Sequence, residues 1–117
     1  MITQAGMERM LRALVEGPLM IALTAGDEEE DDTGYSRQPI TFAPLGWDPE
    51  RSTVYAINAS EVRFPPYSRD ATQPLTGYLI AREDGEPIAM GDLVRPRQPI
   101  ARESIFFGSG DLRIELP

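Results

Sequence analysis

The sequence contains no cysteine, no histidine and no lysine. The missing cysteine excludes disulfides, thiolate metal ligands and thiol nucleophiles. The missing histidine removes the side chain best suited to acid–base chemistry near neutral pH, which is also the commonest metal ligand. Without lysine the chain has no amine for Schiff-base chemistry and no phosphate-binding lysine of a P-loop. Carboxylates, hydroxyls, tyrosine and arginine remain, so most classes of enzyme are excluded.

Long hydrophobic segments are also missing. No apolar run approaches the roughly 20 residues that a membrane-spanning helix needs. The first residues lack the basic start and the continuous apolar stretch of a signal peptide. We therefore expect a soluble, unexported chain with no membrane partner. Its 117 residues and 41% hydrophobic content suffice for one compact domain over residues 1–117.

The excess of negative charge is local. The chain carries a net charge of −8, and six of its 19 acidic residues form one run at residues 27–32. Nucleic acids and anionic lipids bind clustered positive charge, so we expect neither as a partner. The run predicts a solvated, mobile loop. A calcium loop is the alternative, but Asp32 stands at the sixth position, where an EF-hand needs glycine. Docking of the run on an arginine-rich partner stays open.

One helix is predicted, at residues 2–16. Thr3 is suited to the N-cap, and apolar residues then recur every three or four positions along one face. They are Met7, Met10, Leu11, Leu14 and Val15. Gly17 and Pro18 end the helix, because glycine accepts the left-handed conformation and proline cannot continue the helical hydrogen bonds. A helix of this length is marginal alone in water, so its apolar face must lie against the rest of the fold.

From residue 18 onward the pattern changes to short strands separated by turn residues. The predicted extended segments recur about every ten residues, which is typical of a sandwich or a barrel. They are residues 19–23, 35–42, 53–57, 62–64, 75–81, 87–90, 95–99, 104–107 and 112–116. The sequence therefore predicts a mainly β fold. It is an antiparallel, jelly-roll-like β-sandwich over residues 18–117 with one N-terminal α-helix.

Turn chemistry predicts two hairpins and one sheet edge. The Asp84-Gly85 pair readily takes positive φ at both central positions of a tight turn, so the strands on either side should pair. The last two predicted strands should pair in the same way around Gly108 to Gly110. Pro96 cannot donate a backbone hydrogen bond, which places residues 95–99 at the edge of a sheet.

Several segments follow one another in a characteristic order. They are Leu19 to Ala25, Gly34 to Phe42, Ile57 to Ala59, Val62 to Phe64, Leu75 to Ala81, Gly91 to Leu93 with Pro96, Ile105 to Phe107 and Gly110 to Ile114. In this order, which covers nearly the whole chain, the sequence resembles the small tail-fibre-like, minor structural proteins of tailed bacteriophages. Residues 34–38, Gly-Tyr-Ser-Arg-Gln, are the most specific part. The sequence departs from the family pattern at the acidic run and at the proline-rich residues 64–74, both in predicted loops, which tolerate change.

The resemblance implies a virion structural protein, assembled in the host cytoplasm and associated with the tail or tail fibre. Such a protein acts through contacts with other virion proteins, without catalysis and without a cofactor. Capsid decoration, as a cement protein of the phage head, is the close alternative, because both tasks need a small stable sandwich. We also expect a symmetric homo-oligomer, with a trimer as the first hypothesis.

Five residues are candidates for such an interface. Arg95, Arg97 and Arg102 form the only basic cluster, which either protects an edge strand against unwanted pairing or meets acidic neighbours. Trp47 and Tyr67 lie in or beside proline-rich predicted loops. They either cap the core or anchor a partner, and we favour the anchor, since tryptophan, tyrosine and arginine are enriched in interfaces.

Two other classes of function remain open. A carbohydrate-binding module would use the same two aromatic residues as stacking platforms. A carboxylate hydrolase would need a pair of acids, such as Glu83 with Glu86 or Asp92 with Asp111. The first pair flanks a predicted tight turn, where acidic residues are routine, and a chain of this size offers little room for a sugar-binding groove.

Overall fold

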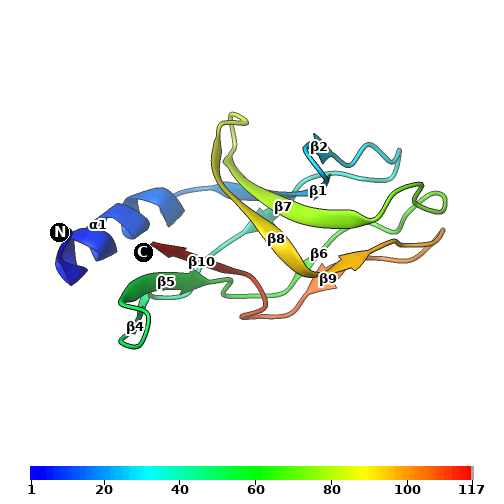
Figure 1. Cartoon of the computed structure of the whole chain (residues 1–117). Coiled ribbons are helices and arrows are strands. Elements are labelled where there is room, and N and C mark those ends of the chain that lie inside the picture. Colours follow the sequence, from blue (N-terminus) through cyan, green and yellow to red (C-terminus); the bar gives the residue numbers. More distant parts are fainter. Residues whose placement is uncertain (117) are drawn as a thin grey trace.

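The computed structural model describes residues 1–116, which form one helix followed by ten short strands (Figure 1). The bounds are α1 Gln4–Val15, β1 Leu19–Ala25, β2 Glu28–Glu29, β3 Gln38–Ile40, β4 Gly46–Asp48, β5 Thr53–Ile57, β6 Val62–Arg63, β7 Leu75–Arg82, β8 Pro87–Arg97, β9 Phe106–Phe107 and β10 Arg113–Leu116. The prediction of a mainly β chain with one N-terminal helix is confirmed. No helix in the described chain is long and apolar enough to cross a membrane.

The strands form two antiparallel layers, consistent with the predicted sandwich. In the upper layer of Figure 1 the order is β2-β1-β7-β8, with β3 also paired to β1. The lower layer holds the sheet β10-β5-β4 and the two-stranded sheet β6-β9. The predicted hairpin at Asp84-Gly85 is confirmed, because β7 and β8 pair antiparallel on either side of it. Of the two turn residues, however, only Gly85 has the predicted positive φ, at +95°.

Helix α1 extends the upper layer beyond the sheet and lies over β5 and β10 (Figure 1). The Thr3 hydroxyl caps its start by accepting a backbone N–H of the first turn at 3.0 Å, as predicted. Gly17 has a φ of +82°, the left-handed conformation expected after the end of the helix. Met7 and Leu11 are buried against β5, whereas Met10 of the predicted apolar stripe is 49% exposed.

The two layers enclose two cores that touch each other. The larger core lies between β1 and β7 on one side and β6 and β9 on the other, and its buried side chains include Ile21, Phe64, Ile80 and Phe107. The smaller core lies between α1 and β5. Ile114 of β10 packs against both cores, so the apolar interior is continuous from the sandwich to the helix.

Arg82, at the end of β7, connects the upper sheet to the end of α1. Its guanidinium donates to the carbonyls of Ala13, Leu14 and Glu16 at 3.0, 3.4 and 2.9 Å. The last carbonyls of a helix lack partners within the helix and carry the negative end of its dipole, so a cation there satisfies both. Strand β7 therefore fixes the position of the helix.

We expect Arg82→Met to lower the free energy of unfolding by about 1–3 kcal/mol, because it leaves the helix carbonyls without a charged donor. Urea unfolding followed by far-UV circular dichroism measures the change. Arg9→Met, at an exposed position of α1, is the matched control and should change stability by less than about 0.5 kcal/mol. Equal effects of the two variants would contradict this role of Arg82.

The predicted final hairpin is wrong. Strand β9 pairs with β6 and strand β10 pairs with β5, so the chain passes from one sheet of the lower layer to the other between them. The turn at residues 108–110 bonds to the chain that follows β5. There the Gly110 N–H donates to the carbonyl of Asn58, and the Ser109 hydroxyl donates to that of Ala59. These long-range bonds direct β10 to β5.

The acidic run is exposed at Asp27, Glu28, Glu29 and Asp31, as its charge predicts, but part of it is bound to the fold. Glu28 and Glu29 form β2 and pair with the end of β1. Glu29 also forms an ion pair with Arg37 at 2.7 Å, and Glu30 accepts the hydroxyl of Tyr67 at 2.6 Å. The sequence did not predict these contacts, because the donors lie elsewhere in the sequence and only the fold brings them to the run.

Asp32 is the most deeply bound carboxylate of the run, with 3% of its side chain exposed. It accepts the N–H of Gly34 at 2.8 Å, the N–H of Ser68 at 3.1 Å and the Ser68 hydroxyl at 2.8 Å. Burial alone raises the pKa of Asp32, but these bonds and the Arg69 guanidinium outweigh burial and lower it. Asp32 thus joins the acidic run to the proline-rich loop around Ser68.

Candidate functional site

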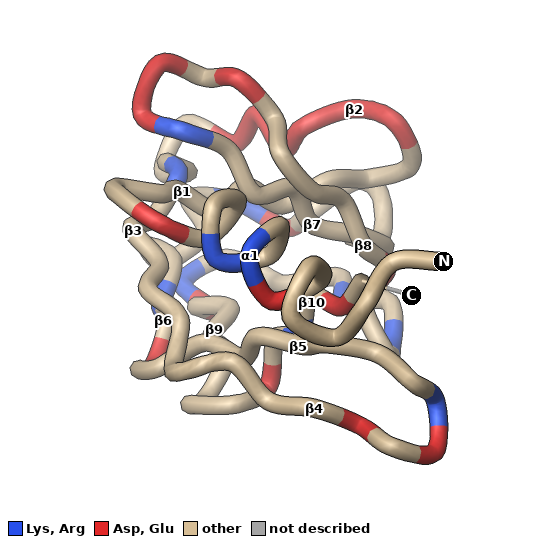
Figure 2. The backbone as a smooth tube through the Cα atoms, turned by 90° about the vertical axis from the view of Figure 1, so that its left-hand side faces the viewer, with Lys and Arg blue, Asp and Glu red and all other residues tan. Residues whose placement is uncertain are grey.

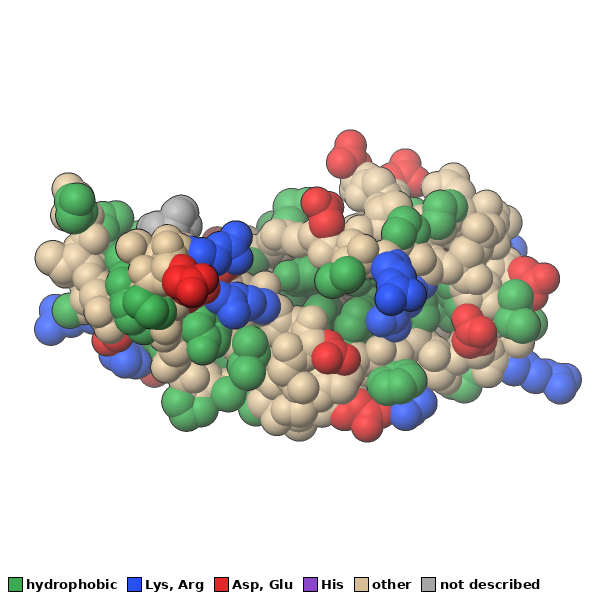
Figure 3. All heavy atoms as spheres, turned by 60° about the horizontal axis from the view of Figure 1, so that its bottom comes forward, with side chains coloured by type: hydrophobic (Ala, Val, Ile, Leu, Met, Phe, Trp, Pro, Cys, Tyr) green, Lys and Arg blue, Asp and Glu red, His purple; other side chains and the backbone are tan. Residues whose placement is uncertain are grey.

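A cleft of about 580 Å³ opens between β8 and the chain from β9 to β10. Tyr78 and residues 92–97 line one side, and Phe107 with residues 111–113 lines the other. Figure 3 looks at this underside of the molecule and shows a hollow with hydrophobic side chains inside it and basic side chains beside it. The walls are the outermost strands of two different sheets, β8 and β10.

The cleft opens where β8 separates from β7. Asp92 is paired with Gly77 and Arg97 with Leu75, so the four residues 93–96 of β8 stand opposite the single residue between Gly77 and Leu75. Extra residues on one strand of a pair bend it away from its partner. Pro96 suits this segment, because it has no N–H to lose. We call residues 93–96 the β8 bulge.

Tyr78 forms part of the apolar floor of the cleft. Its ring covers Gly91 on the neighbouring strand so closely that a Cβ at Gly91 would lie 2.5 Å from it. Its hydroxyl donates to the carbonyl of Arg113 at 3.1 Å and so connects the two walls. Burial, with a smaller effect of Asp92, raises the pKa of Tyr78, which keeps this hydroxyl a donor. Phe107 and Leu112, both buried, complete the floor.

Three arginines stand around this floor, and two of them are held by the fold. Arg97 donates to the carbonyl of Phe106 at 3.1 Å and lies over the ring of Phe107 at 4.9 Å. Arg113 lies over the ring of Tyr55 at 3.9 Å, and it also pairs with two carboxylates of its own sheet at 3.1 and 3.5 Å.

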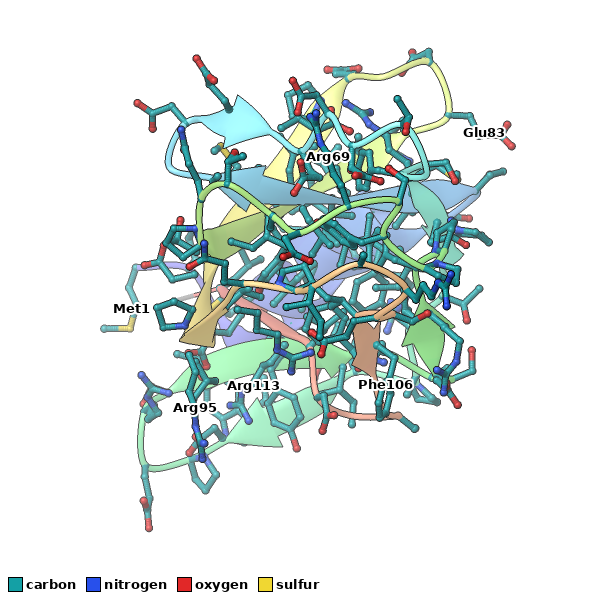
Figure 4. All side chains as sticks on the ribbon, turned by 90° about the vertical axis from the view of Figure 1, so that its right-hand side faces the viewer. Met1, Arg69, Glu83, Arg95, Phe106 and Arg113 are labelled. Atoms are coloured by element: carbon teal, nitrogen blue, oxygen red, sulfur yellow. The ribbon has the colours of Figure 1, made fainter. Side chains whose placement is uncertain are left out.

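Arg95 is the arginine that the fold leaves free. It lies in the β8 bulge beside Arg113 in Figure 4, and it is exposed. Within residues 1–116 its guanidinium has no hydrogen bond and no ion pair. Val94 next to it is 98% exposed. The rim of the cleft therefore offers a free cation beside a free apolar side chain.

The backbone of β10 also offers unpaired groups to the cleft. The Asn58 N–H donates to the carbonyl of Leu112, so the alternation of an antiparallel pair turns the backbone groups of Leu112 and Ile114 toward β5. The backbone groups of Arg113 and Glu115 point away from β5, toward the cleft. On that side the Arg113 carbonyl accepts the hydroxyl of Tyr78. The edge of β10 is therefore open on the side of the cleft.

Two of the five predicted interface residues lie in the cleft. Arg95 and Arg97 line it together, as members of the edge strand that Pro96 predicts. Arg102 lies beyond β8 in an exposed turn with a φ of +72° and is not part of the lining. The basic cluster of the sequence is thus divided in space.

The two aromatic candidates lie elsewhere. Trp47 belongs to β4 instead of the predicted loop position, and it packs partly buried against the core beneath α1. Tyr67 is 3% exposed, because its backbone bonds to Glu103 and directs the ring inward, where its hydroxyl meets Glu30. Burial, with the bond to Glu30, raises the pKa of Tyr67. Its predicted role as an exposed anchor is therefore wrong.

The sequence reasoning missed the opposite wall and the floor. The alternation of residues 112–116 predicts that Arg113 faces outward, and Arg113 is exposed, but alternation alone does not show which strand lies opposite. The sequence indicates no more for Tyr78 and Phe107 than ordinary strand residues. The one signal that could have pointed to the opening was Pro96 in an otherwise continuous strand, since proline interrupts a ladder.

One acidic pair of the hydrolase hypothesis lies in the cleft, and the other lies away from it. Asp92 and Asp111 line the same cleft, but an oxygen of Asp111 accepts the N–H of Gly108 at 2.8 Å and holds the turn before β10. Glu83 and Glu86 lie at the turn between β7 and β8, away from the cleft. No cluster of acidic residues among residues 1–116 is arranged to hold a metal ion.

The chemistry available in the cleft is recognition of an anionic, partly apolar group. Guanidinium groups bind carboxylates through paired, charge-assisted hydrogen bonds, and the floor accepts apolar surface. In comparisons with known proteins, the chain matches no family model, no curated protein and no solved structure.

Proposed function

We propose that this chain is a structural protein of a bacteriophage virion, which acts by binding other virion proteins and catalyses no reaction. A position in the tail or tail fibre is the first form of the proposal, and decoration of the capsid is the second. The ordered segments from Leu19 to Ile114 that resemble small phage structural proteins support the virion assignment. The cleft supports a role in binding proteins.

One observation carries the binding role. The outermost strands of two sheets, β8 and β10, line one cleft, and neither has a partner strand on that side within residues 1–116. Open strand edges are places where neighbouring chains add to a sheet or dock against it. At the rim of the cleft, Val94 of β8 is an exposed apolar side chain next to the free Arg95. A cation beside apolar surface is a composition found in interfaces.

Mass spectrometry of purified particles from the source of the gene tests the proposal. We expect the chain in particles, and in the tail fraction after heads and tails are separated; recovery with the heads would favour the decoration form. Particles from a deletion of the gene are the control and should lack a structure that cryo-electron microscopy resolves in the wild type. A chain found only in the lysate and never in particles would overturn the proposal.

The other two classes receive less support from the structure. Burial of Tyr67 removes one of the two stacking platforms of the carbohydrate hypothesis, so calorimetric titration with host glycans should show no binding by the isolated chain.

For the hydrolase hypothesis, Asp92 is the acid to test, because of the two acids that line the cleft it is the one that does not bind the turn before β10. Glycan turnover that is lost in Asp92→Asn, with folding intact, would contradict the absence of catalysis.

A further inference from the structure

We infer that the cleft binds the acidic β7–β8 turn of a second copy of this chain, so that copies associate head to tail. The inference rests on the proposed function, because it names one partner for the same cleft. By the acidic turn we mean residues 83–86, Glu-Asp-Gly-Glu.

The acidic turn is a preformed projection with free carboxylates. The Arg82 N–H bonds to the carbonyl of Glu86 at 2.9 Å, and Asp84 accepts the N–H of Glu86 at 3.0 Å, so the turn is rigid. Gly85, at a φ of +95°, has nothing near its Cα on the side where a Cβ would point. In Figure 1 the turn stands clear of the rest of the molecule, and Figure 2 shows it as an acidic loop. Within residues 1–116 the side chains of Glu83 and Glu86 bind nothing.

The other acidic segment is less suited to this role. In the run at residues 27–32, Glu29, Glu30 and Asp32 already bind groups of their own chain. The charge of these three residues is therefore used within the fold, and only Asp27, Glu28 and Asp31 of the run stay exposed and unbound within residues 1–116. The acidic turn stands clear of the rest of the molecule (Figure 1), and both of its glutamates face only solvent.

A chain cannot place its own acidic turn in its own cleft. Strand β8 has the turn at its start and the cleft at its end, and its 11 residues, at about 3.3 Å each, hold the two roughly 30 Å apart. Figure 4 shows Glu83 and Arg95 on opposite sides of the molecule. Contact between turn and cleft therefore joins two copies through different surfaces. Such a heterologous contact closes into a ring, such as a trimer, or continues as an open chain.

Charge and chemistry of the two surfaces match. The turn brings the free carboxylates of Glu83 and Glu86, and the cleft offers the free guanidinium of Arg95. Arg97 and Arg113 stand beside Arg95 but already bind groups of their own chain. With Asp92 and Asp111, the charged residues of the lining sum to +1. The carboxylate of Asp111 is partly engaged by the N–H of Gly108. The outward N–H groups of β10 add further donors, and the apolar floor accepts the narrow body of the turn. Complementary charge of this kind selects the partner and fixes the register of contact.

Charge reversal on each side tests the inference. One variant carries Glu83→Arg with Glu86→Arg, and the other carries Arg95→Glu with Arg97→Glu. Sedimentation velocity of the full chain is expected to show self-association of the wild type and at least about tenfold weaker association of each variant alone. An equimolar mixture of the two variants should associate again, because every turn then meets a cleft of opposite charge on the other variant.

Two further variants keep this test interpretable. Asp27→Arg with Glu28→Arg reverses two exposed acids of the β1–β2 turn and is the matched control, which should associate like the wild type. Arg95→Glu alone removes no bond of the fold and replaces the double variant if Arg97→Glu unfolds the chain. A near-UV circular dichroism spectrum like that of the wild type shows that each variant is folded.

Three results would overturn the inference. They are a monomeric wild type at the highest soluble concentration, equal weakening by the control variant, and a mixture of the two variants that stays monomeric. Different results would contradict the proposed function. A chain that is monomeric yet present in particles refutes only the head-to-tail contact, whereas a chain that associates as predicted but is absent from particles refutes the virion role.

Discussion

Asn58→Asp is expected to lower the free energy of unfolding by about 3 kcal/mol or more at neutral pH. Asn58 is completely buried after β5. Its amide nitrogen donates to the carbonyls of Ser60 and Gly108, both at 2.9 Å, and its amide oxygen accepts the N–H of Leu112 at 2.9 Å. An aspartate of the same shape keeps only the last bond. It also places a negative charge against two carbonyl oxygens.

Urea unfolding followed by circular dichroism measures this loss. Asn58→Ala should also destabilise, since it leaves the N–H of the buried Leu112 and the carbonyl of Ser60 without this partner. Ser60→Ala is the control, because Ser60 contributes only its carbonyl to the network and should change stability by less than about 0.5 kcal/mol. A loss below about 1 kcal/mol for Asn58→Asp would show that β10 is held mainly by other contacts.

Asp32→Asn is expected to lower the free energy of unfolding by about 2–4 kcal/mol at pH 7, and the loss should shrink as the pH falls. The asparagine has a single acceptor oxygen and no charge for the two N–H groups and the hydroxyl that Asp32 binds. The pKa of Asp32 is lowered in the folded chain. Its stabilising effect is therefore complete above the unfolded value of about 3.9 and is lost as the pH falls through the folded value.

Denaturation at a series of pH values from about 7 to 2 measures this dependence. The wild-type curve should fall steeply in acid, and the curve of Asp32→Asn should approach it there. Asp31→Asn, at the exposed neighbouring position, is the control and should run parallel to the wild type. A constant difference between Asp32→Asn and the wild type across the whole range would mean that charge is not what Asp32 contributes.

Local patterns in the sequence predicted the elements of this fold but not all of their partners. The helix, its cap at Thr3 and its end at Gly17 follow from residues within a few positions of each other. The same holds for the hairpin at Asp84-Gly85. The pairing of β10 with β5 depends on Asn58, which is more than 50 residues from Leu112, and no periodicity encodes it.

Only one wall of the candidate site could be predicted from the sequence, because the other wall and the floor depend on contacts between distant residues. Arg95, Pro96 and Arg97 are visible in the sequence as a basic edge strand. Arg113 and Tyr78 come from two other strands, and only the arrangement of the sheets brings them opposite. Tyr67 shows the reverse error: its proline-rich neighbourhood suggests a surface loop, but bonds to distant residues bury it.

The docking of α1 on β10 has a consequence for synthesis of the protein. A ribosome makes the helix first, whereas the strand whose Ile114 and Leu116 pack near it comes late in the chain. Until then the apolar face of the nascent helix lacks part of its cover. Distant contacts of this kind slow folding, so we expect the native packing of α1 only after β10 has been made. While it waits on the ribosome, the helix is the segment most in need of a chaperone.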